Sequence, residues 1–206
     1  MITKKYLLAI AFMLLLVQLQ AQSTPGESVP FEVHYGAKDR ELQDLVQLEN
    51  IDYQTITFTG SSLIGKHFIL SANEIWKGEV TATSIIANSL SRKPIADSVF
   101  EVRVISKLDE QKNISMHFHF PGLMARKQFK TTGSPMYSLR NVLQDSKKSF
   151  VTGKRQYFLA HILPIPVPGS PNMLSYCNVD NSGEDVMNWG KKLGIPHYIV
   201  FEFEIF

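Results

Sequence analysis

From Phe31 to the C-terminus, apolar residues recur mostly at every second position of the chain. This period puts alternate side chains on opposite faces of a β-strand, whereas a helix repeats its apolar positions every three or four residues. Turn signals such as Lys77-Gly78 and Gly133-Ser134-Pro135 separate the alternating runs. The pattern predicts strands over residues 31–37, 51–59, 66–77, 80–87, 98–107, 114–120, 124–131, 155–163 and 197–206.

These predicted strands define a mainly β protein. About eight or nine short strands at this spacing are typical of a single antiparallel β-sandwich or a partly closed barrel, and the pattern does not separate the two. One well-capped short helix is predicted over residues 183–193, where Ser182 would cap the first turn with Asp185 three residues on, and Trp189 would face the sheet. Residues 39–49 also fit a helix, although a strand competes there.

The C-terminal segment HYIVFEFEIF alternates as a strand of the core would. One face carries Ile199, Phe201, Phe203 and Ile205, and the other carries Glu202 and Glu204. We therefore expect an integral strand here, with its apolar face buried.

The N-terminus has the features of an export signal. Lys4 and Lys5 precede the apolar residues 7–17, and Leu19-Gln20-Ala21 offers a small-residue cleavage site. The apolar stretch is shorter than the roughly 20 residues that span a bilayer as a helix, and no comparable stretch follows. We expect residues 1–21 to be a signal peptide, residues 22–30 a flexible lead and residues 31–206 a single β-rich domain, secreted or periplasmic and not membrane-spanning.

Export changes the charge balance of the chain. The sequence has 21 basic and 19 acidic residues, and the signal peptide removes two lysines and no acid, which leaves 19 of each and a net charge of zero. A neutral domain gives no support for nucleic-acid binding. The single cysteine, Cys177, permits no internal disulfide, and we expect its thiol to be buried in the core.

Two histidines in the run ISMHFHFPG raise the question of a metal site. If residues 109–111 form a three-residue hairpin loop, Glu101 lies opposite His119 and Arg103 lies opposite His117. Two imidazoles and a carboxylate can bind a metal, but a fixed guanidinium charge beside them repels one. We favour a solvated strand face and expect no bound metal or cofactor.

No local motif indicates catalysis. The sequence lacks a nucleophile elbow, a phosphate-binding loop and a dinucleotide-binding fingerprint. A hydrolase built from Cys177 and Asp180 with His161 or His197 is conceivable, but a structural thiol is the stronger expectation.

The segment LPIPVPGSP carries prolines at 164, 166, 168 and 171, which deny hydrogen bonds to a sheet ladder. It cannot form a central strand. It either protects a sheet edge or docks onto a protein partner, and we favour the first.

These observations favour an exported, soluble, non-catalytic domain that binds a carbohydrate, a protein or a cell-envelope partner. The alternative is a secreted hydrolase or metal-dependent enzyme whose site assembles only in three dimensions. Exposed aromatics on a sheet face would favour binding. A concave pocket that joins a carboxylate, a histidine and a polar nucleophile would favour catalysis.

Overall fold

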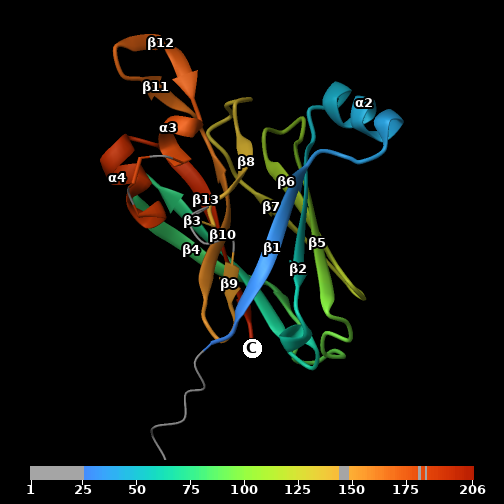
Figure 1. The fold of residues 1–206 in the computed structure, drawn as a ribbon. Helices are drawn as coiled ribbons and strands as arrows, with labels where there is room; N and C mark the ends of the chain where they lie inside the picture. The colour runs from blue at the N-terminus through green and yellow to red at the C-terminus, as the bar shows by residue number, and fades with distance from the viewer. Residues whose placement is uncertain (1–25, 144–148, 181, 184) are drawn as a thin grey trace, which may run out of the picture.

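The computed structural model describes residues 26–143, 149–180, 182–183 and 185–206. The predicted signal peptide and residues 22–25 of the predicted lead lie outside the described residues, and the last residues of that lead belong to strand β1. The chain forms two antiparallel sheets that face one another, so the expected mainly β sandwich is confirmed (Figure 1). Both sheets of the described chain end in edge strands, and neither closes into a barrel.

The six-stranded sheet has the order β7-β6-β5-β2-β1-β9, and the five-stranded sheet has the order β4-β3-β13-β10-β8. The strands of the first are β1 (Ser28–Tyr35), β2 (Asp52–Thr59), β5 (Val99–Leu108), β6 (Ile114–Phe120), β7 (Leu123–Phe129) and β9 (Ser149–Val151). Those of the second are β3 (Phe68–Trp76), β4 (Glu79–Asn88), β8 (Ser138–Asn141), β10 (Gln156–Ile162) and β13 (His197–Ile205). A separate two-stranded sheet consists of β11 (Ile165–Val167) and β12 (Ser170–Ser175).

The helical elements are short. They are α2 (Arg40–Leu48), α3 (Cys177–Asp180), α4 (Trp189–Leu193) and the 3-10 turns η1 (Ser61–Leu63) and η2 (Val186–Asn188). None of the helices in the described part of the chain has both the length and the apolar character that crossing a bilayer requires.

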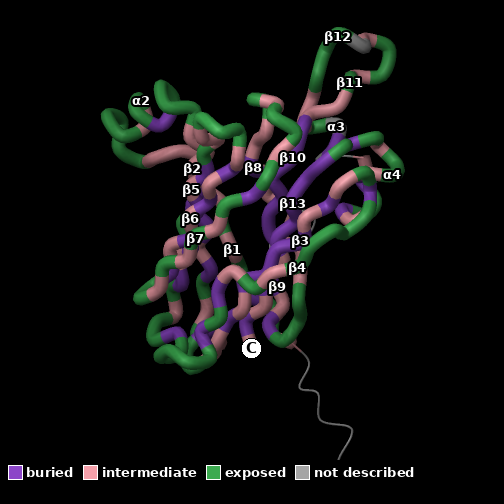
Figure 2. Tube along the Cα trace, turned by 180° about the vertical axis from the view of Figure 1, so that it is seen from behind, coloured by how far each residue is buried: buried purple, intermediate pink, exposed green. Residues whose placement is uncertain are grey.

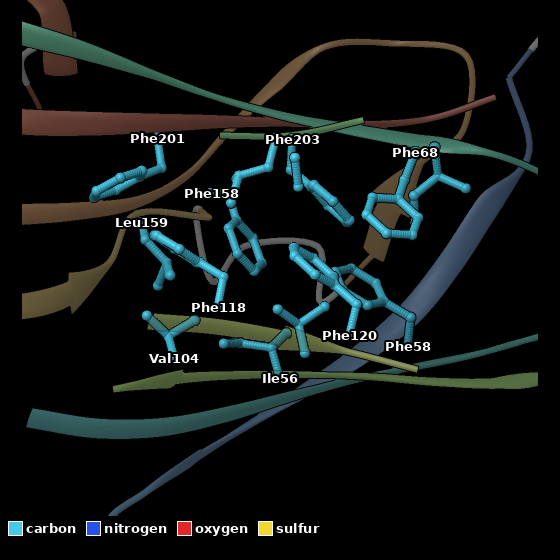
Figure 3. Packing of buried hydrophobic residues seen from close by; sticks show 14 of the residues in the cluster. Ile56, Phe58, Phe68, Val104, Phe118, Phe120, Phe158, Leu159, Phe201 and Phe203 are labelled. Carbon is cyan, nitrogen blue, oxygen red and sulfur yellow. The ribbon is translucent and has the colours of Figure 1, made fainter. Parts of the chain in front are cut away.

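Aromatic side chains fill the layer between the two sheets. Figure 3 shows phenylalanines meeting there, with Phe58, Phe118 and Phe120 from one sheet and Phe158, Phe201 and Phe203 from the other. The ring centroids of Phe118 and Phe201 lie 5.3 Å apart, and those of Phe58 and Phe203 lie 5.7 Å apart. Rings at these distances pack favourably beyond the gain from burial alone.

Strand β13 lies in the middle of the five-stranded sheet, between β3 and β10. The predicted core face is confirmed, since Ile199, Phe201, Phe203 and Ile205 are all fully buried. On the opposite face, Tyr198 and Val200 pack in a second apolar cluster with Trp189 of α4. The inward orientation of Trp189 is therefore confirmed as well.

The predicted helix 183–193 is wrong at its N-terminal end. The described chain becomes helical at Val186, and the Asp185 carboxylate accepts a hydrogen bond from the Met187 N–H at 2.8 Å. The N-cap is Asp185 and not Ser182, whose hydroxyl donates to the Val179 carbonyl. Gly183 has a φ of +73°, which a right-handed helix cannot include. Residue 184 lies outside the described residues.

The helix proposed for residues 39–49 is present as α2. The Asp39 carboxylate caps it by accepting a hydrogen bond from the Leu42 N–H at 2.9 Å. Val46 is the buried residue of this helix, so α2 is attached to the sandwich through a narrow contact. Figure 2 shows α2 and the β11–β12 hairpin as largely exposed segments at one end of the sandwich, in which buried residues are concentrated in the strands.

The predicted register of the β5–β6 hairpin is wrong by two residues. His119 lies opposite Arg103, where we expected Glu101. The turn falls one residue later than predicted because Asp109 still pairs with Asn113 and its carboxylate accepts from the Asn113 N–H. Lys112 takes a φ of +63° and closes the turn. A shift of two residues leaves every side chain on its expected face.

Two expectations concern the region after β10. The proline-rich segment forms part of the β11–β12 hairpin and joins neither main sheet, as its lack of N–H donors required. The expected burial of Cys177 is wrong, since this residue is exposed at the start of α3. The hairpin carries the chain away from the core just before this residue, so the thiol lies at the surface (Figure 1).

Candidate functional site

The interior of the sandwich becomes polar at one end. This apical end carries α2 and the β11–β12 hairpin and lies opposite the C-terminus (Figure 1). Two inward-facing polar residues come from the six-stranded sheet, two from the five-stranded sheet, and one precedes β8. They are Asp52, Ser106, His161, His197 and Tyr137.

The strand period places these polar groups in line with the apolar core. Ser106 follows Val102 and Val104 on the inner face of β5, and it pairs with Asp52 across the ladder to β2. His161 pairs with Ile199, which belongs to the inner face of β13. Burying such groups costs free energy unless hydrogen bonds compensate it.

Hydrogen bonds join the two sheets through this cluster. The Ser106 hydroxyl lies 2.7 Å from Nε2 of His161, and the Asp52 carboxylate lies 3.4 Å from the same nitrogen. The Leu139 N–H donates to that carboxylate at 3.0 Å, and the Gln54 side chain donates to the Leu139 carbonyl at 2.6 Å. The contacts fix the positions of the polar side chains from both sheets.

A second pair of polar groups lies beside the first. The Tyr137 hydroxyl and Nδ1 of His197 share a hydrogen bond of 2.6 Å, and the His197 ring packs on Trp76 at a centroid distance of 4.0 Å. Burial, with the neighbouring His161 as a smaller cause, lowers the pKa of His197 to about 4. Burial also raises the pKa of Tyr137. His197 is therefore a neutral ring near pH 7.

A cleft of about 390 Å³ opens at this cluster. It falls in the size range of small-molecule sites. The residues that line it are Glu49, Asn50, Asp52, Ser106, Lys107, Leu108, Pro135, Tyr137 and His161. At the rim, the Lys107 ammonium donates to the Glu49 carboxylate at 2.5 Å, and both side chains are about half exposed.

A second hollow of about 460 Å³ lies on the outer face of the six-stranded sheet. Ile51, Ile105 and Leu108 contribute an apolar floor, and His117 lies at its margin. The apical cleft is the better candidate for a specific site, because buried polar side chains from both sheets meet there.

The cleft brings together the residue types of a serine hydrolase, but in a different arrangement. In a Ser-His-Asp triad the carboxylate holds Nδ1–H of the imidazole while Nε2 takes the serine proton. Here Ser106 and Asp52 approach the same nitrogen, and Nδ1 of His161 is buried without a partner among the described residues. Ser106 lines the cleft although it is only 2% exposed.

The His117–His119 pair lies on the outer face, away from the cleft. Arg103 lies opposite His119, and Arg126 lies opposite His117. Partial burial lowers the pKa of His119, and the charge of Arg103 and the neighbouring His117 lower it further. The carboxylate of Glu101 pairs with Arg103 at 3.6 Å, so it does not join the imidazoles.

Over the described ranges, no three His, Cys, Asp or Glu side chains form a group suited to a metal ion. The expectation that the protein binds no metal stays a prediction. The proposed cysteine hydrolase gains no support, because Cys177 is absent from the residues that line the cleft.

Sequence reasoning did not single out Asp52, Ser106 or Tyr137. It considered His161 and His197 as partners of Cys177, and otherwise as strand-face residues more than as metal ligands. One signal was available: Ser106 interrupts the apolar inner face of β5, and His161 does the same on β10. Polar residues at core positions are rare unless they are paired, so such interruptions mark candidate site residues.

Comparison of the chain with protein-family models, curated proteins and solved structures finds no match in any of the three. The fold and the cleft are therefore the basis for assigning a function.

Proposed function

We propose that the protein is an exported, non-catalytic binding protein that holds a small saccharide in its apical cleft. The observation that carries the proposal is the convergence of buried polar side chains from both sheets on one cleft, in place of the apolar residues that fill the rest of the interior. Such polar clusters are costly to bury, and functional sites are where proteins retain them.

The free hydrogen-bonding capacity of the cleft suits a hydroxyl group. The contacts of the Asp52 carboxylate involve Oδ2. No described residue donates a hydrogen bond to Oδ1, the other oxygen of this carboxylate. A carboxylate near Nε2 of His161 favours the hydrogen on that nitrogen, so Nε2–H donates to Ser106 and leaves the serine hydrogen free. A sugar hydroxyl can donate to Asp52 and accept from Ser106 at once.

The remaining walls fit the same class of ligand. The Tyr137 ring provides an apolar surface for the C–H face of a sugar, and the Glu49–Lys107 pair provides further polar atoms at the rim. A cleft of about 390 Å³ accommodates a monosaccharide or disaccharide more readily than a protein segment.

The proposal is tested by titrating the protein with a panel of neutral monosaccharides and disaccharides, using calorimetry and amide chemical shifts. We expect a ligand whose affinity falls about tenfold or more in Asp52→Asn and Ser106→Ala, because each variant removes a hydrogen bond to a buried group. Ser98→Ala, at a partly exposed position that does not line the cleft, is the matched control. Affinities that are equal in all three variants would contradict the assignment.

Hydrolysis is the second candidate, because one cleft joins a carboxylate, a histidine and a serine. A fluorophosphonate probe, which reacts with activated serines, distinguishes it from binding. We expect no labelling of Ser106, since Nε2 of His161, which already carries a hydrogen, cannot also accept the serine proton. Stoichiometric labelling that is lost in Ser106→Ala would establish the hydrolase instead.

The export part of the proposal rests on residues 1–21. Cleavage after Ala21 gives a mature chain that starts at Gln22, and the intact mass of the exported protein reports it. A mature species that keeps Lys4 and Lys5 would contradict both the compartment and the net charge of zero.

A further inference from the structure

The apical end presents apolar side chains to solvent on two projections. On α2, Leu42, Leu45 and Leu48 are 44%, 57% and 74% exposed. On the β11–β12 hairpin, Met173 and Leu174 are 62% and 46% exposed. Soluble domains seldom gather so many exposed apolar residues in one region unless the region contacts something.

The two projections extend from the same end of the molecule. Figures 1 and 2, which view the protein from opposite sides, both place α2 and the hairpin on either side of that end, away from the C-terminus. A partner surface wide enough to cover this end of the molecule can therefore contact both projections.

The charges at this end limit what it can contact. From Ile162 to Val179, which includes the whole hairpin, the sequence contains no Lys, Arg, His, Asp or Glu. Around α2, residues 38–49 contain two basic and four acidic residues, a net charge of −2. The surface therefore combines uncharged and acidic elements, which do not attract an anionic partner.

We propose that the apical end docks onto the surface of a zwitterionic phospholipid bilayer, with the leucines of α2 and Met173 and Leu174 of the hairpin entering the interfacial region. An amphipathic helix binds a membrane surface through its apolar side while its polar side stays in water. Entry of the hairpin is favourable because it carries no charged residue, and each charged group would add a penalty.

A fluid bilayer fits these projections better than a rigid protein does. Tight protein interfaces centre on Trp, Tyr and Arg in well-packed pockets. The exposed residues here are leucines and a methionine on two separate projections. A bilayer adapts to both projections, whereas a protein partner or a second copy would need two complementary pockets at a fixed distance.

Co-sedimentation of the exported protein with phosphatidylcholine vesicles tests the inference, without saccharide, so that the result is independent of the cleft. Removing an exposed leucine from an apolar contact changes a partition constant by about tenfold. We expect Leu45→Gln and Leu48→Gln together to lower vesicle binding at least about tenfold, and Met173→Gln with Leu174→Gln to do the same. Ile85→Gln, at a 65% exposed position on β4, should bind as wild type does.

The expected binding does not increase when anionic lipid is added and does not fall with salt, because no basic patch contributes to it. Absence of vesicle binding would overturn the inference, as would binding that requires anionic lipid or that Ile85→Gln reduces equally. Sedimentation velocity of the same variants tests whether a second copy of the protein binds this surface instead. If wild type self-associates, the leucine variants do not, and no variant binds vesicles, the surface is an interface between two copies.

Discussion

On the inner face of β13, His197 is fully buried in a strand whose next inward positions are apolar. Its ring contacts Trp76 and Tyr137, and burial, with the neighbouring His161 as a smaller cause, lowers its pKa. A charge at this position would lose most of its hydration without gaining a carboxylate, so the neutral ring is stabilised. Single buried residues of this kind make the stability of the protein depend on pH.

We predict that stability falls as the pH drops from about 6.5 to about 4. The unfolded chain binds a proton at His197 near its ordinary pKa, whereas the folded chain binds it only near a pKa of about 4. The contribution is therefore complete above pH 6.5 and is lost across that interval, by on the order of 3 kcal/mol. Urea unfolding as a function of pH measures it, with His197→Gln as the comparison. Parallel losses in the two proteins across this interval would show that another group is responsible.

A second residue-scale prediction concerns His117 and His119. Each faces an arginine on a neighbouring strand, and Glu101 is paired elsewhere. Fixed positive charge beside two imidazoles opposes a cation, so we expect no stoichiometric metal in the purified protein. Elemental analysis and zinc titration of wild type and a His117→Ala, His119→Ala double variant check this. One bound equivalent that the variant loses would be the contrary result.

At the scale of elements, α4 is held close to the turn between β3 and β4. A Cβ atom placed on Gly190 would lie 2.6 Å from the Cα and 2.7 Å from the N of Gly78. Gly78 has a φ of +80°, so its backbone is itself fixed by the turn. Neither side of this contact can accept an added methyl group without a backbone shift.

We therefore predict that Gly190→Ala destabilises the protein by about 1–3 kcal/mol, the usual cost of overpacking. Gly60→Ala is the control, because a Cβ atom placed on Gly60 would have its nearest neighbour at 3.5 Å and the φ of 165° there is extended backbone. Chemical denaturation compares the two variants. Equal and small changes would mean that α4 moves freely away from the turn.

At the scale of the whole molecule, β13 connects the two apolar clusters. One of its faces packs in the core between the sheets, and the other packs against the helical layer that includes Trp189. It also hydrogen-bonds with both β3 and β10, so its removal would split the five-stranded sheet. Few other segments contribute to so many parts of the fold.

Deletion of residues 197–206 should leave the chain unfolded or aggregated. Loss of its four inward apolar side chains removes about 6 kcal/mol or more, against a total stability of about 5–15 kcal/mol for a typical domain. Glu202→Gln should change stability little, since its ion pair with Arg155 at 3.9 Å is partly exposed. Circular dichroism melts compare the two. Cooperative melting of the truncated chain near the wild-type temperature would rule out the central role of β13.

The elements that sequence reasoning predicted well are those set by local pattern. The alternation of β13 and the helix at residues 40–48 depend on neighbouring residues, and both are confirmed. The helix at residues 183–193 was placed too early because Gly183 takes a left-handed conformation that sequence spacing does not reveal. The β5–β6 register was wrong because the pairing of Asp109 with Asn113 moved the turn by one residue.

The sequence by itself determined which residues of each strand face the core, because a period of two assigns alternate side chains to one face whatever the neighbouring strand is. Only the tertiary structure decided which strands face one another. Ser106 and His161 are separated by 55 positions and come from different sheets, so their contact depends on how the sheets pack. The same packing places α2 and the β11–β12 hairpin at one end. Strand patterns are local, whereas a cleft between sheets is a property of the assembled fold.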